Sequence, residues 1–249
     1  MCRFGGEYMP YAGYYGLGMY WDPTYMLVIL GTLLCLAASA HVNSTMSKYS
    51  KVRNMTGLTG AEAARRILHY EGLYDVQIEC IENNKGDHYD PKTKTVRLSR
   101  ENFYNTSVTG VGVAAHECGH ALQHAKGYGP LKIRSALVPV VNIGSNLGLP
   151  MILIGVLLGW NQTLIQIGIW AFSLAVLFQL VTLPVEFNAS RRAVGKIEQY
   201  GLLSGEETRG CQKVLTAAAL TYVAAAASSV LQLLRLVILF GGNNRRRRD

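Results

Sequence analysis

Long uncharged segments separate the polar parts of this chain. Residues 135–185 form a run of 51 residues without Asp, Glu, Lys or Arg. As a helix, such a run would extend about 75 Å, enough to cross a hydrocarbon core of about 30 Å twice. Residues 159–162, Gly-Trp-Asn-Gln, provide a turn with a tryptophan suited to the membrane interface. The pattern predicts a transmembrane helical hairpin at 136–184, whose first helix is kinked by Pro139 and Pro150.

Two further apolar segments lie outside this hairpin. Residues 24–40 are uncharged and rich in Leu, Val, Ile and Ala, and we interpret them as a transmembrane anchor. A signal peptide cleaved after Ala-Ser-Ala at 38–40 is the alternative. Residues 214–240 are apolar but interrupted by Arg235, so this segment either spans the membrane or packs along it. Residues 1–23 form a Gly/Tyr-rich arm to which we assign no chemistry.

Basic residues flank the apolar segments on one side. Lysines and arginines follow the first anchor and lie on both sides of the hairpin 136–184, whereas the turn of the hairpin has none. The positive-inside rule therefore predicts that residues 41–134 and 185–213 lie in the cytoplasm.

The C-terminal tail, 241–249, contains four consecutive arginines. A spanning helix at 214–240 would place them outside the cell, against the same rule, which favours a helix packed on the membrane. No aromatic residues interleave the arginines, so we expect contact with anionic lipid headgroups and no nucleic-acid partner.

The overall composition agrees with a membrane protein. Charged residues make up 16% of the 249 residues, against about 25% in an average soluble domain, although the net charge is +8. This excludes a disordered chain and argues against a simple water-soluble globule. The five cysteines are scattered and do not form a disulfide framework, which indicates a reducing compartment.

The most specific motif is His116-Glu117-Cys118-Gly119-His120, an HExxH sequence. On a helix, the two histidines at positions i and i+4 lie on one face and can ligate one Zn²⁺. Glu117 can then act as the general base toward a water molecule. The alternative is an amphipathic helix with two surface histidines. The motif predicts the chemistry of a zinc metallopeptidase.

A catalytic zinc site of this kind needs a third protein ligand. His124 is about 12 Å along the same helix from His116, which is too far to share an ion, so we interpret it as a supporting or surface residue. Glu186 is the better candidate because the hairpin 136–184 returns the chain to the membrane face that it left. The alternative for Glu186 is a carboxylate that complements a helix dipole.

The residues before the motif predict a small α+β domain. Thr59 and Glu62 form a capping box at the start of a helix over 59–72. Residues 76–81 and 95–98 are predicted strands of a hairpin whose turn is 87–94.

An edge strand of this hairpin is the candidate for binding an extended substrate. Candidates for stabilising the oxyanion, which the sequence does not separate, are His88, Tyr89, Arg191 and Tyr200.

These motifs resemble a known family, the bacterial YugP-like membrane zinc metallopeptidases. The resemblance rests on His88-Tyr89-Asp90-Pro91, on the stretch around His116–His120 and on Glu186-Phe187-Asn188-Ala189-Ser190, and covers nearly the whole chain after the arm. More distantly, the chain is similar to CAAX prenyl and heat-shock membrane endopeptidases. That similarity implies Glu186 as the third zinc ligand. Those relatives have Asp where this chain has Ser190.

The sequence thus predicts a mainly α, multi-span membrane protein with a small gluzincin-like metallopeptidase domain. The expected activity is hydrolysis of peptide bonds at the cytoplasmic membrane face, with one Zn²⁺ held by His116, His120 and Glu186 and with Glu117 as the base. The expected partners are a peptide or protein substrate and the lipid bilayer. A zinc-binding membrane scaffold or sensor without catalytic activity is the alternative.

Overall fold

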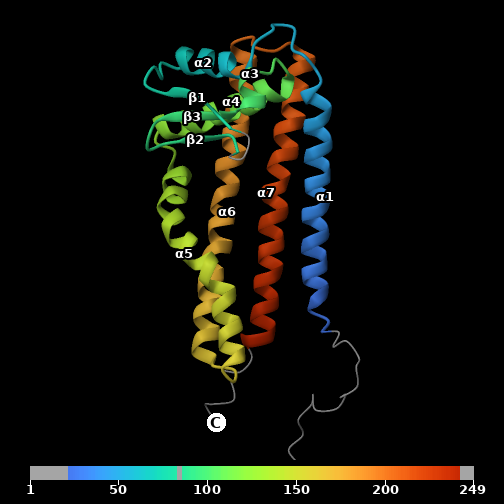
Figure 1. The fold of residues 1–249 in the computed structure, drawn as a ribbon, viewed down its shortest axis with the longest axis vertical. Helices are drawn as coiled ribbons and strands as arrows, with labels where there is room; N and C mark the ends of the chain where they lie inside the picture. The colour runs from blue at the N-terminus through green and yellow to red at the C-terminus, as the bar shows by residue number, and fades with distance from the viewer. Residues whose placement is uncertain (1–21, 83–85, 242–249) are drawn as a thin grey trace, which may run out of the picture.

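The computed structural model describes residues 22–82 and 86–241, and most of them are helical. Long helices run along the main axis of the molecule: α1 (Tyr25–Ser50), α5 (Gly129–Leu157), α6 (Gln162–Gln199) and α7 (Gly205–Phe240). A small α+β domain lies at one end of them (Figure 1). Both the described N-terminal residues and the end of α7 lie at the opposite end. The predicted fold class, a mainly helical membrane protein with a small α+β domain, is confirmed.

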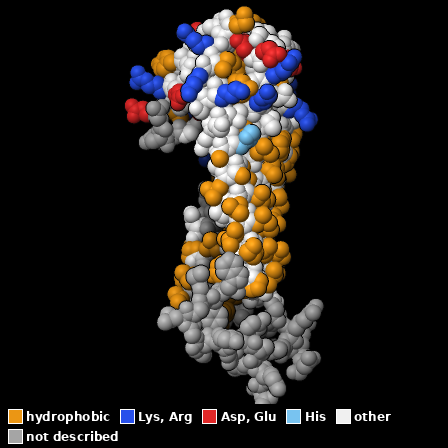
Figure 2. All heavy atoms as spheres, turned by 90° about the vertical axis from the view of Figure 1, so that its right-hand side faces the viewer, with side chains coloured by type: hydrophobic (Ala, Val, Ile, Leu, Met, Phe, Trp, Pro, Cys, Tyr) orange, Lys and Arg blue, Asp and Glu red, His pale blue; other side chains and the backbone are white. Residues whose placement is uncertain are grey.

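Within the described residues, three helices are long and apolar enough to cross a membrane, namely α1, α6 and α7. Their outward-facing side chains are large and apolar, among them Leu36 and Trp170. Figure 2 shows hydrophobic side chains along the long helices, whereas Lys, Arg, Asp and Glu gather on the small domain. Such a surface fits a hydrocarbon environment better than water.

Helix α7 bears on the question that the sequence left open for 214–240. The helix continues without a break from the small domain to Phe240, along α1 and α6 (Figure 1). Its length and apolar composition make α7 a candidate membrane span. The arginines of the tail had instead favoured a helix that packs along the membrane without crossing it. The arginines 245–248 lie outside the described residues, as does most of the predicted arm 1–23.

Helices α5 and α6 form the predicted hairpin around the turn at 158–161. Pro139 and Pro150 lie inside α5, and Figure 1 shows α5 bending away from α6 toward the small domain. In the described part of α5, the apolar stretch Asn146–Leu157 is shorter than a full span. The bend sends the polar start of α5 toward the small domain.

The sheet of the small domain corrects the predicted strand pairing. β1 (Gln77–Ile81), β2 (His88–Asp90) and β3 (Thr95–Ser99) lie in the order β1-β3-β2, with β1 parallel to β3 and β2 antiparallel to β3. The expected hairpin between 76–81 and 95–98 is therefore wrong, since β1 and β3 are parallel and residues 88–90 of the supposed turn form strand β2.

The physical reason lies in the tight turn between β2 and β3. The Asp90 carboxylate accepts a hydrogen bond from the backbone N–H of Lys92 at 2.9 Å and forms an ion pair with Arg97 at 2.9 Å. The Arg97 guanidinium and this N–H hold the pKa of the Asp90 carboxyl well below its usual range. The turn is complete within 91–94, so the partner of β3 is the segment just before it.

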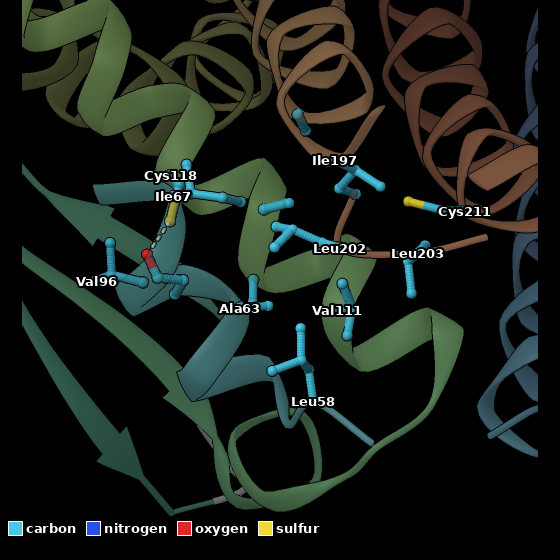
Figure 3. Close-up of a cluster of buried hydrophobic side chains, with 14 of the residues drawn as sticks. Leu58, Ala63, Ile67, Val96, Val111, Cys118, Ile197, Leu202, Leu203 and Cys211 are labelled. Atoms are coloured by element: carbon cyan, nitrogen blue, oxygen red, sulfur yellow. Dashed lines mark hydrogen bonds between the residues drawn. The ribbon is translucent and has the colours of Figure 1, made fainter. Parts of the chain in front are cut away.

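A compact apolar core joins the small domain to the long helices (Figure 3). It is built from α2 (Gly60–Tyr70), α4 (Val108–Ala125), β3 and the domain ends of α6 and α7, with the short helix α3 (Arg100–Tyr104) beside it. Ile67, Val111 and Ile197 are fully buried there. Because α4 lies in the middle of this core, its position relative to α6 is fixed by burial on several sides.

The predicted capping box of α2 is confirmed and provides a stability test. The Thr59 hydroxyl accepts from the N–H of Glu62, whose carboxylate accepts from the N–H of Thr59. We expect Thr59→Ala to lower the free energy of unfolding by about 1 kcal/mol, measured by thermal or denaturant unfolding in detergent. Glu62→Gln keeps both partners and is the control, since glutamine also completes a capping box.

Candidate metal centre

Helix α4 presents the HExxH motif from a buried position. Ser107 caps the helix by accepting from the N–H of Gly110, and nearly every residue after it is buried. At Gly119 the backbone of α4 comes so close to α6 that an added Cβ would lie 2.5 Å from the carbonyl oxygen of Ala189. This close approach brings the histidines of α4 beside Glu186 of α6.

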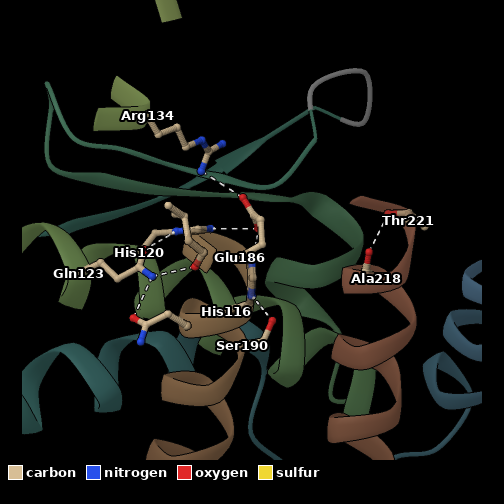
Figure 4. Close-up of polar contacts among 10 residues, drawn as sticks. His116, His120, Gln123, Arg134, Glu186, Ser190, Ala218 and Thr221 are labelled. Carbon is tan, nitrogen blue, oxygen red and sulfur yellow. Dashed lines mark hydrogen bonds and ion pairs between the residues drawn. The ribbon is translucent and has the colours of Figure 1, made fainter. Parts of the chain in front are cut away.

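Three potential metal ligands converge at this contact (Figure 4). The Nε2 atoms of His116 and His120 lie 3.2 and 3.5 Å from Oε2 of Glu186. One donor atom from each of the three residues lies within 4.8 Å of the others. Two imidazoles and one carboxylate at this spacing are a donor set that suits zinc. His116, His120 and Glu186 therefore lie close enough to bind one metal ion.

The environment of His120 fixes its tautomer for metal binding. Gln123 donates its amide N–H groups to the carbonyl of Val185 at 2.8 Å and to Oδ1 of Asn188 at 3.0 Å. Its amide oxygen is left to face Nδ1 of His120 at 3.0 Å. Nδ1 of His120 therefore carries the proton, and the lone pair of Nε2 points toward the metal centre.

The electrostatics of the site favour a positive charge between the ligands. Burial lowers the pKa of His120, but the contact with Glu186 and the charge of Glu117 outweigh it and raise this pKa above its usual value. Two buried carboxylates beside two imidazoles thus favour a positive charge at this place. A divalent cation between the same ligands would supply it.

Further side chains orient the remaining ligands. Ser190 Oγ lies 3.1 Å from Nδ1 of His116, so the serine that replaces the relatives' aspartate still contacts a ligand. Arg134, from the start of α5, donates to Oε1 of Glu186 at 3.0 Å. Since Glu186 is only 2% exposed, this ion pair leaves Oε2 as the oxygen that faces the histidines.

Glu117 lies at the wall of a small cavity next to these ligands. Its side chain is 7% exposed, and no hydrogen bond to its carboxylate occurs among the described residues. The cavity has a volume of about 180 Å³, enough for a few water molecules or one side chain. Its lining comes from α1, α4, α6, α7 and the residue directly before β2: Met46, Asp87, Val113, His116, Glu117, Glu186, Ser190, Val214, Leu215, Ala218, Ala219 and Tyr222.

The predicted oxyanion candidates do not line this cavity. The Tyr89 hydroxyl lies 2.9 Å from Nδ1 of His124, and burial raises the pKa of Tyr89 to about 12. Among the described residues, the donors that converge at the site are those of His116, His120 and Glu186, and His124 is not one of them. Tyr200 donates to Glu71 at 2.6 Å, and Nδ1 of His88 lies 2.8 Å from the carbonyl of Gly86. Arg191 lines a neighbouring groove.

Sequence reasoning missed three residues that the structure places at the site: Gln123, Arg134 and Tyr222. Gln123 follows His120 by three positions on one helix face, which is a signal that could have been used. Arg134 is one of several basic residues that flank the hairpin 136–184, and nothing in the sequence distinguishes it from the others. Tyr222 gave no signal because it lies in an apolar segment, where a tyrosine also suits the membrane interface.

Arg134 provides a test of ligand positioning. We expect Arg134→Gln to weaken zinc affinity about tenfold, because Glu186 would lose the partner that orients its carboxylate. Competition with a chromogenic chelator measures this affinity without any need for activity. Lys132→Gln, two residues away on α5, is the control, and an equal loss of affinity in both variants would contradict a specific role for Arg134.

The comparisons with known proteins agree with this geometry. Residues 24–241 match the model of a family described as "Putative neutral zinc metallopeptidase". The chain belongs to this family. It is also 50% identical over 203 residues to the protein named "Putative membrane protease YugP" of Bacillus subtilis (strain 168), a match that covers 80% of this chain and 90% of the relative. No solved structure matches the chain.

Proposed function

We propose that this protein is a membrane-embedded zinc endopeptidase whose site consists of His116, His120 and Glu186 as ligands and Glu117 as the general base. The observation that carries the proposal is the convergence of these ligands beside the cavity that Glu117 lines. Membership of a zinc metallopeptidase family supports the reaction class, and the apolar helices support the location.

Each residue around the cavity can have a distinct role in peptide hydrolysis. Zinc bound to the three ligands would supply a Lewis acid that polarises a carbonyl and activates water. Glu117 accepts a proton from the water that enters the cavity and returns it to the amine that leaves. Gln123 and Ser190 hold the two imidazoles in place, and Arg134 holds the carboxylate of Glu186.

A peptide substrate can approach along strand β2. The sheet order places β2 at an edge, and Asp87, directly before it, lines the cavity. Asp87 is held by the backbone N–H of Ser99 at 2.6 Å and by Asn102 at 2.8 Å, which makes this wall rigid. An extended peptide that pairs with β2 would bring its backbone to the cavity.

The position of the site within the molecule indicates where it acts. Glu186 is the first charged residue of α6 after the uncharged run 135–185. The small domain beside this end of α6 carries most of the charged side chains that Figure 2 shows. The lysines and arginines on this end favour the cytoplasmic face of a bacterial plasma membrane. The substrate is then a peptide or protein that reaches this membrane surface.

The proposal is tested with purified protein in detergent and β-casein as the substrate. We expect one zinc per chain and casein fragments whose rate of formation falls to background on chelation and returns when zinc is added. Zinc below a tenth of an equivalent after reconstitution would disprove the metal site. Full zinc with no cleavage of casein or of a mixed peptide library would favour a scaffold that binds zinc without turnover.

A further inference from the structure

A groove between α6 and α7 lies beside the candidate metal centre. Its volume is about 530 Å³, and it is lined by one face of each helix. The residues of α6 are Phe187, Ser190, Arg191, Val194, Gly195 and Glu198, and those of α7 are Gln212, Leu215, Thr216 and Ala219. The proposed catalytic site comprises the cavity and strand β2, and the groove has no role in it so far.

The groove adjoins the cavity that Glu117 lines. Ser190, Leu215 and Ala219 line both spaces. Ser190 is also the residue whose hydroxyl contacts His116. A chain that occupied the groove would therefore lie directly beside a metal ligand and next to the cavity. This proximity points to the substrate as the occupant.

The length of the groove fits a short extended peptide. From Phe187 to Glu198 the helix α6 rises about 16 Å, at about 1.5 Å per residue. An extended chain advances about 3.3 Å per residue, so about five residues would fill this length.

The surface of the groove is apolar along its floor and polar at its rim. Val194, Leu215 and Ala219 provide the apolar contacts, whereas Arg191 and Glu198 are exposed and carry opposite charges. A Cβ added at Gly195 would meet no atom within 4 Å, so the space above this glycine is open. Such a surface suits uncharged side chains of a flexible peptide.

We propose that this groove binds about five extended residues of an unfolded, mainly apolar polypeptide segment on one side of the bond to be cleaved. The inference rests on the proposed function and deepens it. Strand β2, which meets the cavity through Asp87, takes the segment on the other side. The substrates of this site are then unfolded segments of at least this length, and very short peptides are poor substrates.

Gly195→Trp tests the groove because a Cβ at this position meets nothing within 4 Å and the indole ring adds a large side chain to the groove. Gly205→Trp is the matched control, since Gly205 is exposed at the start of α7, outside groove and cavity, and a Cβ there also meets nothing within 4 Å. Each change is made in the zinc-loaded Glu117→Gln protein. Binding of fluorescein-labelled β-casein is measured by fluorescence anisotropy, so the result does not depend on turnover.

We expect Gly195→Trp to weaken casein binding at least tenfold at unchanged zinc content, and Gly205→Trp to leave it unchanged. In proteins that retain Glu117, the same loss should appear mainly in KM. Equal binding by both tryptophan variants, or no binding of casein to the zinc-loaded protein, would overturn the groove proposal. If casein bound through the groove but the wild type did not cleave it, the result would support the groove as a binding site and contradict the proposed peptidase activity.

Discussion

Replacement of Glu117 by glutamine is expected to lower the turnover of β-casein about a thousandfold, while the zinc content stays at one per chain. The amide has nearly the shape of the carboxylate but cannot accept a proton from water. General-base catalysis contributes about a hundredfold to ten-thousandfold in enzymes, which sets the expected size. The measurement combines initial cleavage rates with metal analysis on the same samples.

The control for this prediction is Glu206→Gln. Glu206 is an exposed carboxylate on α7 that forms an ion pair with Arg209 at the surface and does not line the cavity. The Glu206→Gln variant loses the same charge as Glu117→Gln and should keep wild-type activity. If Glu117→Gln retained more than a tenth of the wild-type rate with full zinc, another group would have to act as the base.

Local rules of sequence account for much of the fold. The capping box at Thr59 and a helical hairpin at 136–184 follow from short-range chemistry, and both appear in the structure. That both arms of the hairpin cross a membrane stays a prediction. The proximity of Glu186 to the HExxH helix followed from topology, because a hairpin returns the chain to its starting face. The structure brings the three donors together, whereas the catalytic role of Glu117 stays a prediction.

Contacts between distant segments were not predictable in the same way. Arg134 and Glu186 are separated by the whole hairpin, and their ion pair depends on how α5 bends near its prolines. The predicted strand pairing is wrong because the turn before β3 comprises only residues 91–94 and not the whole of 87–94. In both cases a side-chain contact selected one of several arrangements that the sequence pattern permits.

Gly119 shows how one such long-range contact supports the metal centre. In the HExxH motif it occupies a variable position, so the motif alone gives it no role. In the structure it lets α4 approach α6, with Ala189 carbonyl oxygen 2.5 Å and Ala189 Cα 3.1 Å from where a Cβ would stand. These atoms are backbone, so they cannot rotate away. Any side chain at this position must separate the helices that carry the ligands.

We expect Gly119→Ala to weaken zinc binding about a hundredfold and to destabilise the protein by about 1–3 kcal/mol, the usual cost of overpacking. Helix propensity alone predicts the opposite sign, a gain of about 0.5–1 kcal/mol, so the direction of the change separates the two explanations. Chelator competition and thermal unfolding in detergent measure both quantities. Gly205→Ala, where the new methyl group meets nothing within 4 Å, should leave zinc affinity unchanged. A Gly119→Ala protein that is more stable and binds zinc normally would show that α4 and α6 do not pack this closely.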